Sequence, residues 1–259
     1  MKKFISNKIV QFTLGFLFLI FLWWIISILV DSNNMIFPSP FNTIIAMEDF
    51  LKKPSTYDAL FFSIFRLILG FIISFVIAFI LAIIVHDNET LYTFFSPIIT
   101  FFKSVPTATV VFLFIILSGV SYASMLVVVT ITFPILYEAI VSSLKSTDET
   151  VLQASRIDGA SKFKQLFLIQ LPIGTPYIIL GIVSSFSLAF KVEVMSEVIM
   201  GYTKGGIGAM IKNSQLIDPT NLTTMFAYSL IAIILMLVIT LIANIVKPII
   251  VKKYNLQGN

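Results

Sequence analysis

The sequence contains no cysteine and only one histidine, His86, among its 259 residues. Without cysteine the chain forms neither a disulfide nor a zinc–thiolate site, and a single histidine cannot supply the paired ligands of a haem iron. These absences exclude the commonest metal centres and argue against redox chemistry within this chain.

Charge is also scarce, since Asp, Glu, Lys and Arg make up 12% of the residues whereas hydrophobic residues make up 58%. The mean hydropathy of +1.01 is too high for a soluble domain, whose surface needs polar residues. Most of the chain is therefore expected to lie in lipid. The net charge of +4 does not indicate a nucleic-acid partner, because the basic residues fall at the ends of apolar runs and form no stripe with interleaved aromatics.

Six apolar segments are candidates to cross the membrane as helices, which takes roughly 20 residues for about 30 Å of hydrocarbon. The sequence predicts an all-α membrane protein, one domain over residues 1–259, with spans at 12–30, 59–85, 105–117, 122–141, 173–200 and 222–246. The first run follows Met1-Lys2-Lys3 as in a signal peptide. It lacks a small-x-small cleavage site, so it is expected to remain as a helix.

The third segment is irregular, because Pro97, Lys103 and Pro106 interrupt the apolar stretch from Leu91 to Leu117. Proline removes a backbone donor and bends or breaks a helix. We expect a bent or surface-lying lead-in from residue 91 and the true span from about Val105 onward. Lys103 is interpreted as an anchor at the inner surface, although it could also face a neighbouring protein.

The distribution of lysine and arginine predicts the orientation in the membrane. With six spans both termini lie on one side, and basic residues favour the cytoplasmic side. That side would hold Lys2, Lys3, Lys8, Lys145, Arg156, Lys162, Lys164, Lys247, Lys252 and Lys253, against Lys52, Lys53, Lys204 and Lys212 outside. Ten residues against four predict cytoplasmic termini.

One long polar loop, residues 142–172, separates the fourth and fifth predicted spans. Ser146-Thr147-Asp148-Glu149 is a good helix-start sequence, and Gly159 allows a turn, so two short helices around Gly159 are expected. After the turn, Phe163, Leu166, Phe167 and Gln170 follow the spacing of an amphipathic helix face. By pattern alone the loop is as consistent with an ordinary surface helix pair as with a docking element.

The loop resembles the EAA loop of binding-protein-dependent ABC importer permeases. The resemblance rests on Gln153-Ala154-Ser155, Gly159 and Ala160, and Ile169-Gln170-Leu171-Pro172. In that family the loop is a coupling helix seated on a cytoplasmic ATPase, so it implies ATPase coupling through Gln153, Ala154, Ser155, Gly159, Ala160, Ile169, Leu171 and Pro172. Gln153 and Ser155 depart from the family's usual Glu and Ala.

Further segments resemble the subgroup that imports sulfonates, taurine, nitrate and thiamine precursors. They are Phe37-Pro38-Ser39-Pro40, Ser63-Ile64-Phe65-Arg66 with Gly70-Phe71, Lys103-Ser104-Val105-Pro106, Phe133-Pro134, Ala189-Phe190-Lys191, Ser196-Glu197 and Gly206-Ile207-Gly208. Leu117-Ser118-Gly119 replaces the subgroup's frequent Trp-Phe-Gly. The resemblance implies a small polar or anionic solute.

Three charges lie in the second half of the fifth predicted span: Lys191, Glu193 and Glu197. On a helix Glu193 and Glu197 share a face, while Lys191 points elsewhere. Charges at membrane depth usually line a pathway or a bundle interior. A translocation-pathway role for all three is favoured, because Lys191 and Glu197 match the subgroup; alternatively the helix ends near Phe190 and the charges lie in an external loop.

Two other charges, Arg66 and Glu138, each lie near a span end, where snorkelling to lipid headgroups is a sufficient explanation. Gly205-Gly206-Ile207-Gly208 is a weak glycine motif, and the sequence contains no Walker A pattern. ATP hydrolysis, with its Mg²⁺, is therefore expected on a separate subunit, and this chain is expected to be no enzyme and to hold no metal or cofactor.

Taken with the resemblance, these features predict a permease in a bacterial cytoplasmic membrane. The implied partners are an ATPase dimer, a second permease copy forming a homodimer, an extracytoplasmic binding protein and lipid. One alternative is an ion-coupled secondary transporter in which Glu193 or Glu197 carries the coupling ion, although no inverted repeat is evident. The other is a membrane-embedded enzyme, which no His or Cys cluster supports.

Overall fold

The computed structural model describes residues 8–30, 36–201 and 205–253, and over these ranges the chain is helical and forms no strand. Lys2, Lys3 and Lys204 of the predicted charge distribution lie outside the described residues. The elements are α2 (Lys8–Val30), α3 (Pro40–Leu51), α4 (Pro54–His86), α5 (Glu89–Ser104), α6 (Thr107–Ser118), α7 (Val120–Lys145), α8 (Glu149–Ile157), α9 (Lys162–Gln165), the π-helical turn η1 (Leu166–Gln170), α10 (Leu171–Met200), α11 (Ile207–Ile217) and α12 (Thr223–Lys253).

Five helices are long and apolar enough to cross a membrane. They are Val10–Val30, Pro54–His86, Val120–Lys145, Lys162–Met200 and Thr223–Ile249, and they coincide with five of the six predicted spans. The fifth predicted span runs as one helix to Met200 and stops at Gly201, whose φ is 69°. The alternative in which this helix ends near Phe190 is therefore wrong.

The third predicted span differs from a simple crossing helix. Between α5 and α6 the chain bends by 97°, so the pair is a broken span or a re-entrant segment. Val105 is extended because it precedes Pro106, whose ring disfavours helix at the preceding residue. The 12 residues of α6 extend about 18 Å, so the segment 105–117 cannot cross about 30 Å of hydrocarbon alone.

The core of the bundle lies where α4, α7 and α10 pack together. Small side chains at the contacts, among them Ala78 and Ala82 of α4, are fully buried and allow close helix approach. The Thr132 hydroxyl of α7 donates to the Ser74 hydroxyl of α4 at 2.8 Å. This hydrogen bond satisfies two buried polar groups that lipid could not solvate.

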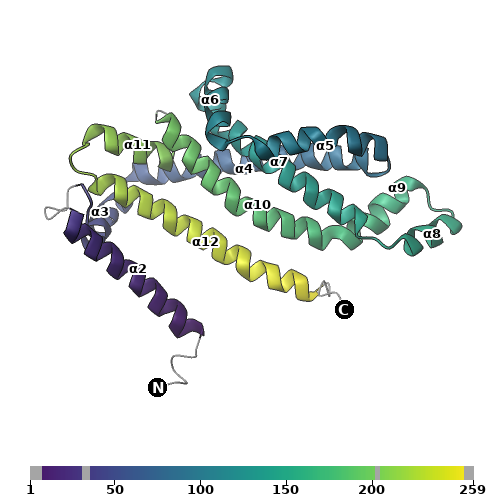
Figure 1. Cartoon of the computed structure of the whole chain (residues 1–259), viewed down its shortest axis with the longest axis horizontal. Helices are drawn as coiled ribbons and strands as arrows, with labels where there is room; N and C mark the ends of the chain where they lie inside the picture. The colour runs from purple at the N-terminus through teal and green to yellow at the C-terminus, as the bar shows by residue number, and fades with distance from the viewer. Residues whose placement is uncertain (1–7, 31–35, 202–204, 254–259) are drawn as a thin grey trace.

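Figure 1 shows an elongated molecule with two distinct ends. The short helices α8 and α9 and the turn between α4 and α5 lie at one end, and α3 and α11 lie at the other. The helix α2 is peripheral and touches the bundle near α3, where the Trp23 indole donates to the Pro38 carbonyl at 3.1 Å. The sequence did not predict α3 or α11, which are too short to span.

Candidate functional site

Three charged side chains from two helices form a cluster inside the bundle. Arg66 of α4 donates from Nε to Glu193 Oε1 of α10 at 3.2 Å and from Nη2 to Glu197 Oε1. Both carboxylate side chains are 0% exposed and the arginine side chain is 12% exposed. Burial of charges is tolerated only when they are paired and hydrogen-bonded, so the cluster ties α4 to α10.

Glu197 is the most completely satisfied member of the cluster. The Ser63 hydroxyl lies 2.9 and 2.8 Å from its two oxygens, and the Gly208 N–H donates to Oε2 at 3.0 Å. Ser63 in turn accepts from the Ile207 N–H at 2.9 Å. Glu193 is less complete, because its Oε2 atom has no hydrogen-bond partner among the described residues.

The segment Gly205–Gly208 closes over the cluster, and its glycines make that approach possible. A Cβ on Gly206 would lie 2.6 Å from Glu197 Oε1, and one on Gly208 would lie 2.4 Å from the Val194 carbonyl. Arg66 Nη2 also donates to the Gly205 carbonyl at 2.7 Å. The weak glycine motif therefore serves to seat a loop on a buried ion pair.

The structure confirms that Glu193 and Glu197 share one helix face and that Lys191 does not, since Lys191 is exposed. The snorkelling interpretation is wrong for Arg66, whose guanidinium faces the two carboxylates. Snorkelling is not a sufficient explanation for Glu138, because its carboxylate accepts a hydrogen bond from Lys103 Nζ at 2.8 Å. The sequence offered a signal for Arg66: Ser63 to Arg66, Glu197 and Gly206 to Gly208 each resembled the same subgroup.

The polar loop folds as two short helices around a turn, as its sequence predicts. Asp148 begins α8: its Oδ1 accepts from the Thr150 N–H at 2.8 Å, and these Thr150 hydrogen bonds hold the pKa of the Asp148 carboxyl below its usual value. At the other end, Gly159 has a φ of 80°, and the Ala160 N–H donates to the Ser155 carbonyl at 2.9 Å. This is a Schellman turn, which favours glycine.

The tip of the loop exposes large apolar side chains. Ile157 is 87% exposed and Phe163 is 69% exposed, and the Phe163 and Phe167 rings contact each other at a tilt of 38° with centroids 4.5 Å apart. Of the predicted coupling residues, Gln153, Ala154, Gly159 and Pro172 are exposed, and Ser155, Ala160, Ile169 and Leu171 are half-buried. Exposed apolar side chains grouped at a polar end of the molecule, here the Phe163–Phe167 pair, are typical of an interaction surface.

A π-helical turn connects this tip directly to the membrane helix α10. Its end residues Leu166 and Gln170 are buried against the bundle, whereas Phe163 and Phe167 remain exposed. The four residues predicted to share one amphipathic face therefore do not: two pack against the bundle and two remain exposed, because a π turn shifts the helix register. The helix is continuous from Lys162 to Met200.

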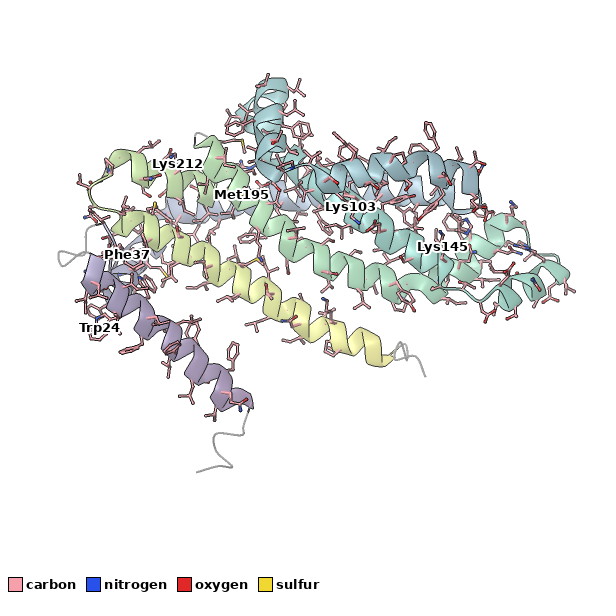
Figure 2. All side chains as sticks on the ribbon, in the orientation of Figure 1. Trp24, Phe37, Lys103, Lys145, Met195 and Lys212 are labelled. Atoms are coloured by element: carbon pink, nitrogen blue, oxygen red, sulfur yellow. The ribbon has the colours of Figure 1, made fainter. Side chains whose placement is uncertain are left out.

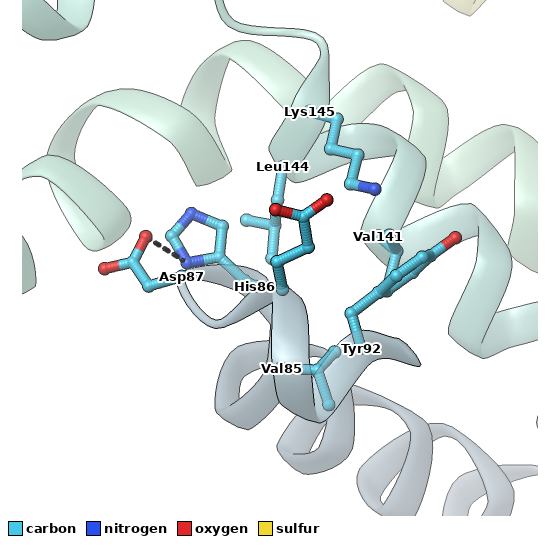
Figure 3. Close-up of a pocket in the computed structure, with 8 residues that line it drawn as sticks. Val85, His86, Asp87, Tyr92, Val141, Leu144 and Lys145 are labelled. Carbon is cyan, nitrogen blue, oxygen red and sulfur yellow. Dashed lines mark ion pairs between the residues drawn. The ribbon is translucent and has the colours of Figure 1, made fainter. Parts of the chain in front are cut away.

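A second connection joins the loop to the turn between α4 and α5. Lys162 Nζ lies 3.3 Å from Asp87 Oδ2, and Asp87 Oδ1 lies 3.0 Å from His86 Nδ1 (Figure 3). His86 and Asp87 line a cavity of about 430 Å³, where Lys145 Nζ lies 4.0 Å from the Tyr92 ring centroid. Within the described ranges, no group of three or more His, Cys, Asp or Glu is placed to hold a metal ion.

Long apolar helices with paired interior charges define a multi-pass membrane protein. The family model described as "Binding-protein-dependent transport system inner membrane component" matches residues 74–256, which is more than half of the chain. The chain belongs to this family and is the permease component of an ABC importer.

Among the solved structures that this chain resembles are two crystal forms of the inward-facing MetNI methionine ABC transporter. One has a TM-score of 0.63 at 16% identity, covering 74% of this chain and 94% of that chain. The other has a TM-score of 0.60 at 18% identity, covering 76% and 94%. Identities this low establish a shared fold and do not transfer a substrate. The family assignment supports the ABC importer permease over the alternative of an ion-coupled secondary transporter.

Proposed function

We propose that this permease works with a separate ATPase dimer, which docks on the tip of the loop formed by α8 and α9. The observation that carries the proposal is the exposed apolar tip: Ile157 ends α8 at the Schellman turn, and Phe163 lies on the helix that continues through η1 into α10. Closure of the ATPase would push the tip and move α10 as a unit. This chain supplies the conduit and the lever, and the ATPase supplies the free energy of ATP hydrolysis.

The remaining parts of the proposal follow from the family and the sequence. A second copy of the permease completes the translocation pathway, an extracytoplasmic binding protein delivers the solute, and the solute is small and polar or anionic. The permease lies in the cytoplasmic membrane of a bacterium with both termini in the cytoplasm. In support, α12 runs towards the end that carries α8 and α9, and α2 runs the opposite way (Figure 1).

The docking proposal is tested by two matched isoleucine substitutions. Ile157 at the loop tip is 87% exposed, and Ile217 of α11, at the opposite end of the bundle, is 84% exposed. Ile157→Asp should lower the affinity for the ATPase at least tenfold, because it places a charge in an apolar contact, whereas Ile217→Asp should leave the affinity unchanged. Co-purification with the ATPase and titration calorimetry measure both. Equal affinities for the two variants would refute docking at the tip.

A further inference from the structure

A row of hydroxyls runs along one side of α5, the helix that leads into the bend. Tyr92, Ser96, Thr100 and Ser104 recur at every fourth position, which places them on one face. Thr100 and Ser104 each donate to the carbonyl four residues earlier, at 2.9 and 2.8 Å. Their oxygens still have free lone pairs, so the row presents hydrogen-bond acceptors away from its own helix.

A charged pair lies beside this row, midway along the bundle (Figure 2). Lys103 Nζ is 2.8 Å from Glu138 Oε1 of α7, and the two side chains are 46% and 50% exposed. Figure 2 places Lys103 midway along the bundle, between Lys212 near the α11 end and Lys145 near the α8 and α9 end. Half-exposed charges in the middle of a membrane bundle are costly if they face hydrocarbon. Their exposed sides therefore require water or polar protein.

Tyr137 of α7 adds an unused hydrogen-bonding group. Its side chain is 3% exposed, yet its hydroxyl has no hydrogen-bond partner among the described residues. The ring lines a cavity of about 280 Å³ between α5 and α7, together with Tyr92, Ser96, Thr100 and Glu138. A buried hydroxyl without a partner requires an explanation, such as a water or a ligand. We call this space the α5–α7 groove.

The α5–α7 groove shares lining residues with two neighbouring cavities. Tyr92 also lines the cavity at His86 and Lys145, and Tyr92, Ser96 and Thr100 also line a third hollow of about 600 Å³ that reaches Ser104. From Tyr92 to Ser104 the row extends about 18 Å along α5. The three hollows therefore follow the hydroxyl row from the α4–α5 turn to the bend before α6.

We propose that the α5–α7 groove is the solute path along this protomer, that Lys103 and Glu138 form its charged subsite, and that the solute carries both an anionic group and an ammonium. The reason is charge matching. A solute with one charge leaves Lys103 or Glu138 without a counterion once their pair opens, and an unpaired desolvated charge is strongly unfavourable. A zwitterion satisfies both, and the hydroxyl row can bind its remaining polar atoms. This inference rests on the permease function and narrows its solute class.

Because the chain has no cysteine, single-cysteine variants can locate the path without interference. Ser96→Cys and Thr100→Cys lie in the groove, while Phe94→Cys and Ile98→Cys lie on other exposed parts of the same helix. A charged methanethiosulfonate reacts only with a thiolate that meets water. In vesicles containing the full complex, the groove cysteines should react more than tenfold faster than the two controls. Reaction no faster than at Phe94→Cys and Ile98→Cys would overturn the path.

The charged subsite is tested with reagents of opposite charge on the Thr100→Cys background. With Lys103 and Glu138 intact, the cationic and anionic reagents should react at rates within about threefold of each other, as a subsite for both charges requires. Lys103→Gln should slow the anionic reagent several-fold, and Glu138→Gln should slow the cationic one. Tenfold exclusion of either reagent from the intact groove, or no change in either variant, would contradict the zwitterion proposal.

These experiments are independent of ATP and of the loop tip. Slow labelling of the groove combined with normal ATPase binding would refute the α5–α7 path and leave the permease function intact. Rapid labelling combined with equal ATPase affinity of Ile157→Asp and Ile217→Asp would refute the docking proposal instead. Unchanged elution and thermal unfolding of each cysteine variant verify that labelling reports the folded protein.

Discussion

Arg66 of α4 donates to the carboxylate of Glu197 in α10, although 131 positions separate the two residues in the chain. The contact also organises the backbone, because Arg66 reaches the Gly205 carbonyl and Glu197 accepts from the Gly208 N–H. One ion pair thus joins two membrane helices and the loop that precedes α11. The cluster therefore holds α4, α10 and this loop together.

Arg66→Gln should destabilise the permease severely. The substitution leaves two carboxylates that are 0% exposed without their cation, and removing one partner of a buried ion pair costs about 3–5 kcal/mol. Thermal unfolding in detergent, in a double-mutant cycle with Glu197→Gln, should give a coupling energy of at least about 1 kcal/mol. Additive effects of the two substitutions would show that the pair does not hold α4 to α10.

Gly206→Ala should also destabilise the protein, for a steric reason. Gly206 has a φ of 138°, and a Cβ there would lie 2.6 Å from Glu197 Oε1. Backbone strain of this kind costs about 1–3 kcal/mol, which at about 2–4 °C per kcal/mol for a chain of this size corresponds to a fall in Tm of roughly 2–12 °C. Gly15→Ala in α2 is the matched control, since nothing lies within 4 Å of its Cβ position. Equal Tm values for both variants would contradict the clamped loop.

The spans and the two-helix loop could be predicted because their signals are local: long apolar runs, a helix-starting Asp148 and a turn-forming Gly159. The ion cluster could not, because Arg66, Glu193 and the glycine segment meet only after α4 and α10 pack. For the same reason the sequence does not predict that Lys103 pairs with Glu138, and each is interpreted by itself as lying at the membrane surface. The prolines predicted the break before α6, but its 97° bend depends on packing that the sequence pattern does not encode.

Asp148 should support coupling throughout the neutral pH range. Its folded pKa is lowered by the hydrogen bonds from Thr150, so its contribution is present above the unfolded value of about 3.9 and is lost only as pH falls through the lower folded value. Asp148→Ala should weaken ATPase binding several-fold between pH 6 and 8, and Asp148→Asn should stay within about twofold because Asn also caps helices. A pH series of ATPase affinity checks this. A wild-type affinity that follows the protonation of Asp148 between pH 8 and 6 would contradict the assignment, because the lowered pKa keeps this carboxyl ionised over that range.

Lys191 is proposed to face a part of the pathway outside the α5–α7 groove, because it is an exposed charge on the membrane helix α10 and such charges need water or protein. Lys191→Ala should abolish uptake without reducing the amount of folded protein in the membrane. Lys191→Arg should retain most of the uptake, since it keeps the charge. Uptake assays paired with quantification of the membrane fraction distinguish these results, and normal uptake by Lys191→Ala would remove Lys191 from the pathway.

The energy source of transport is the central claim, and one measurement tests it most directly. Proteoliposomes containing the permease and its ATPase are supplied with the loaded binding protein, and solute uptake is followed with ATP present or absent and with ion gradients intact or dissipated by ionophores. We expect uptake to require ATP and to persist when the gradients are dissipated. Uptake that continues without ATP on an ion gradient alone would contradict an ATP-driven permease.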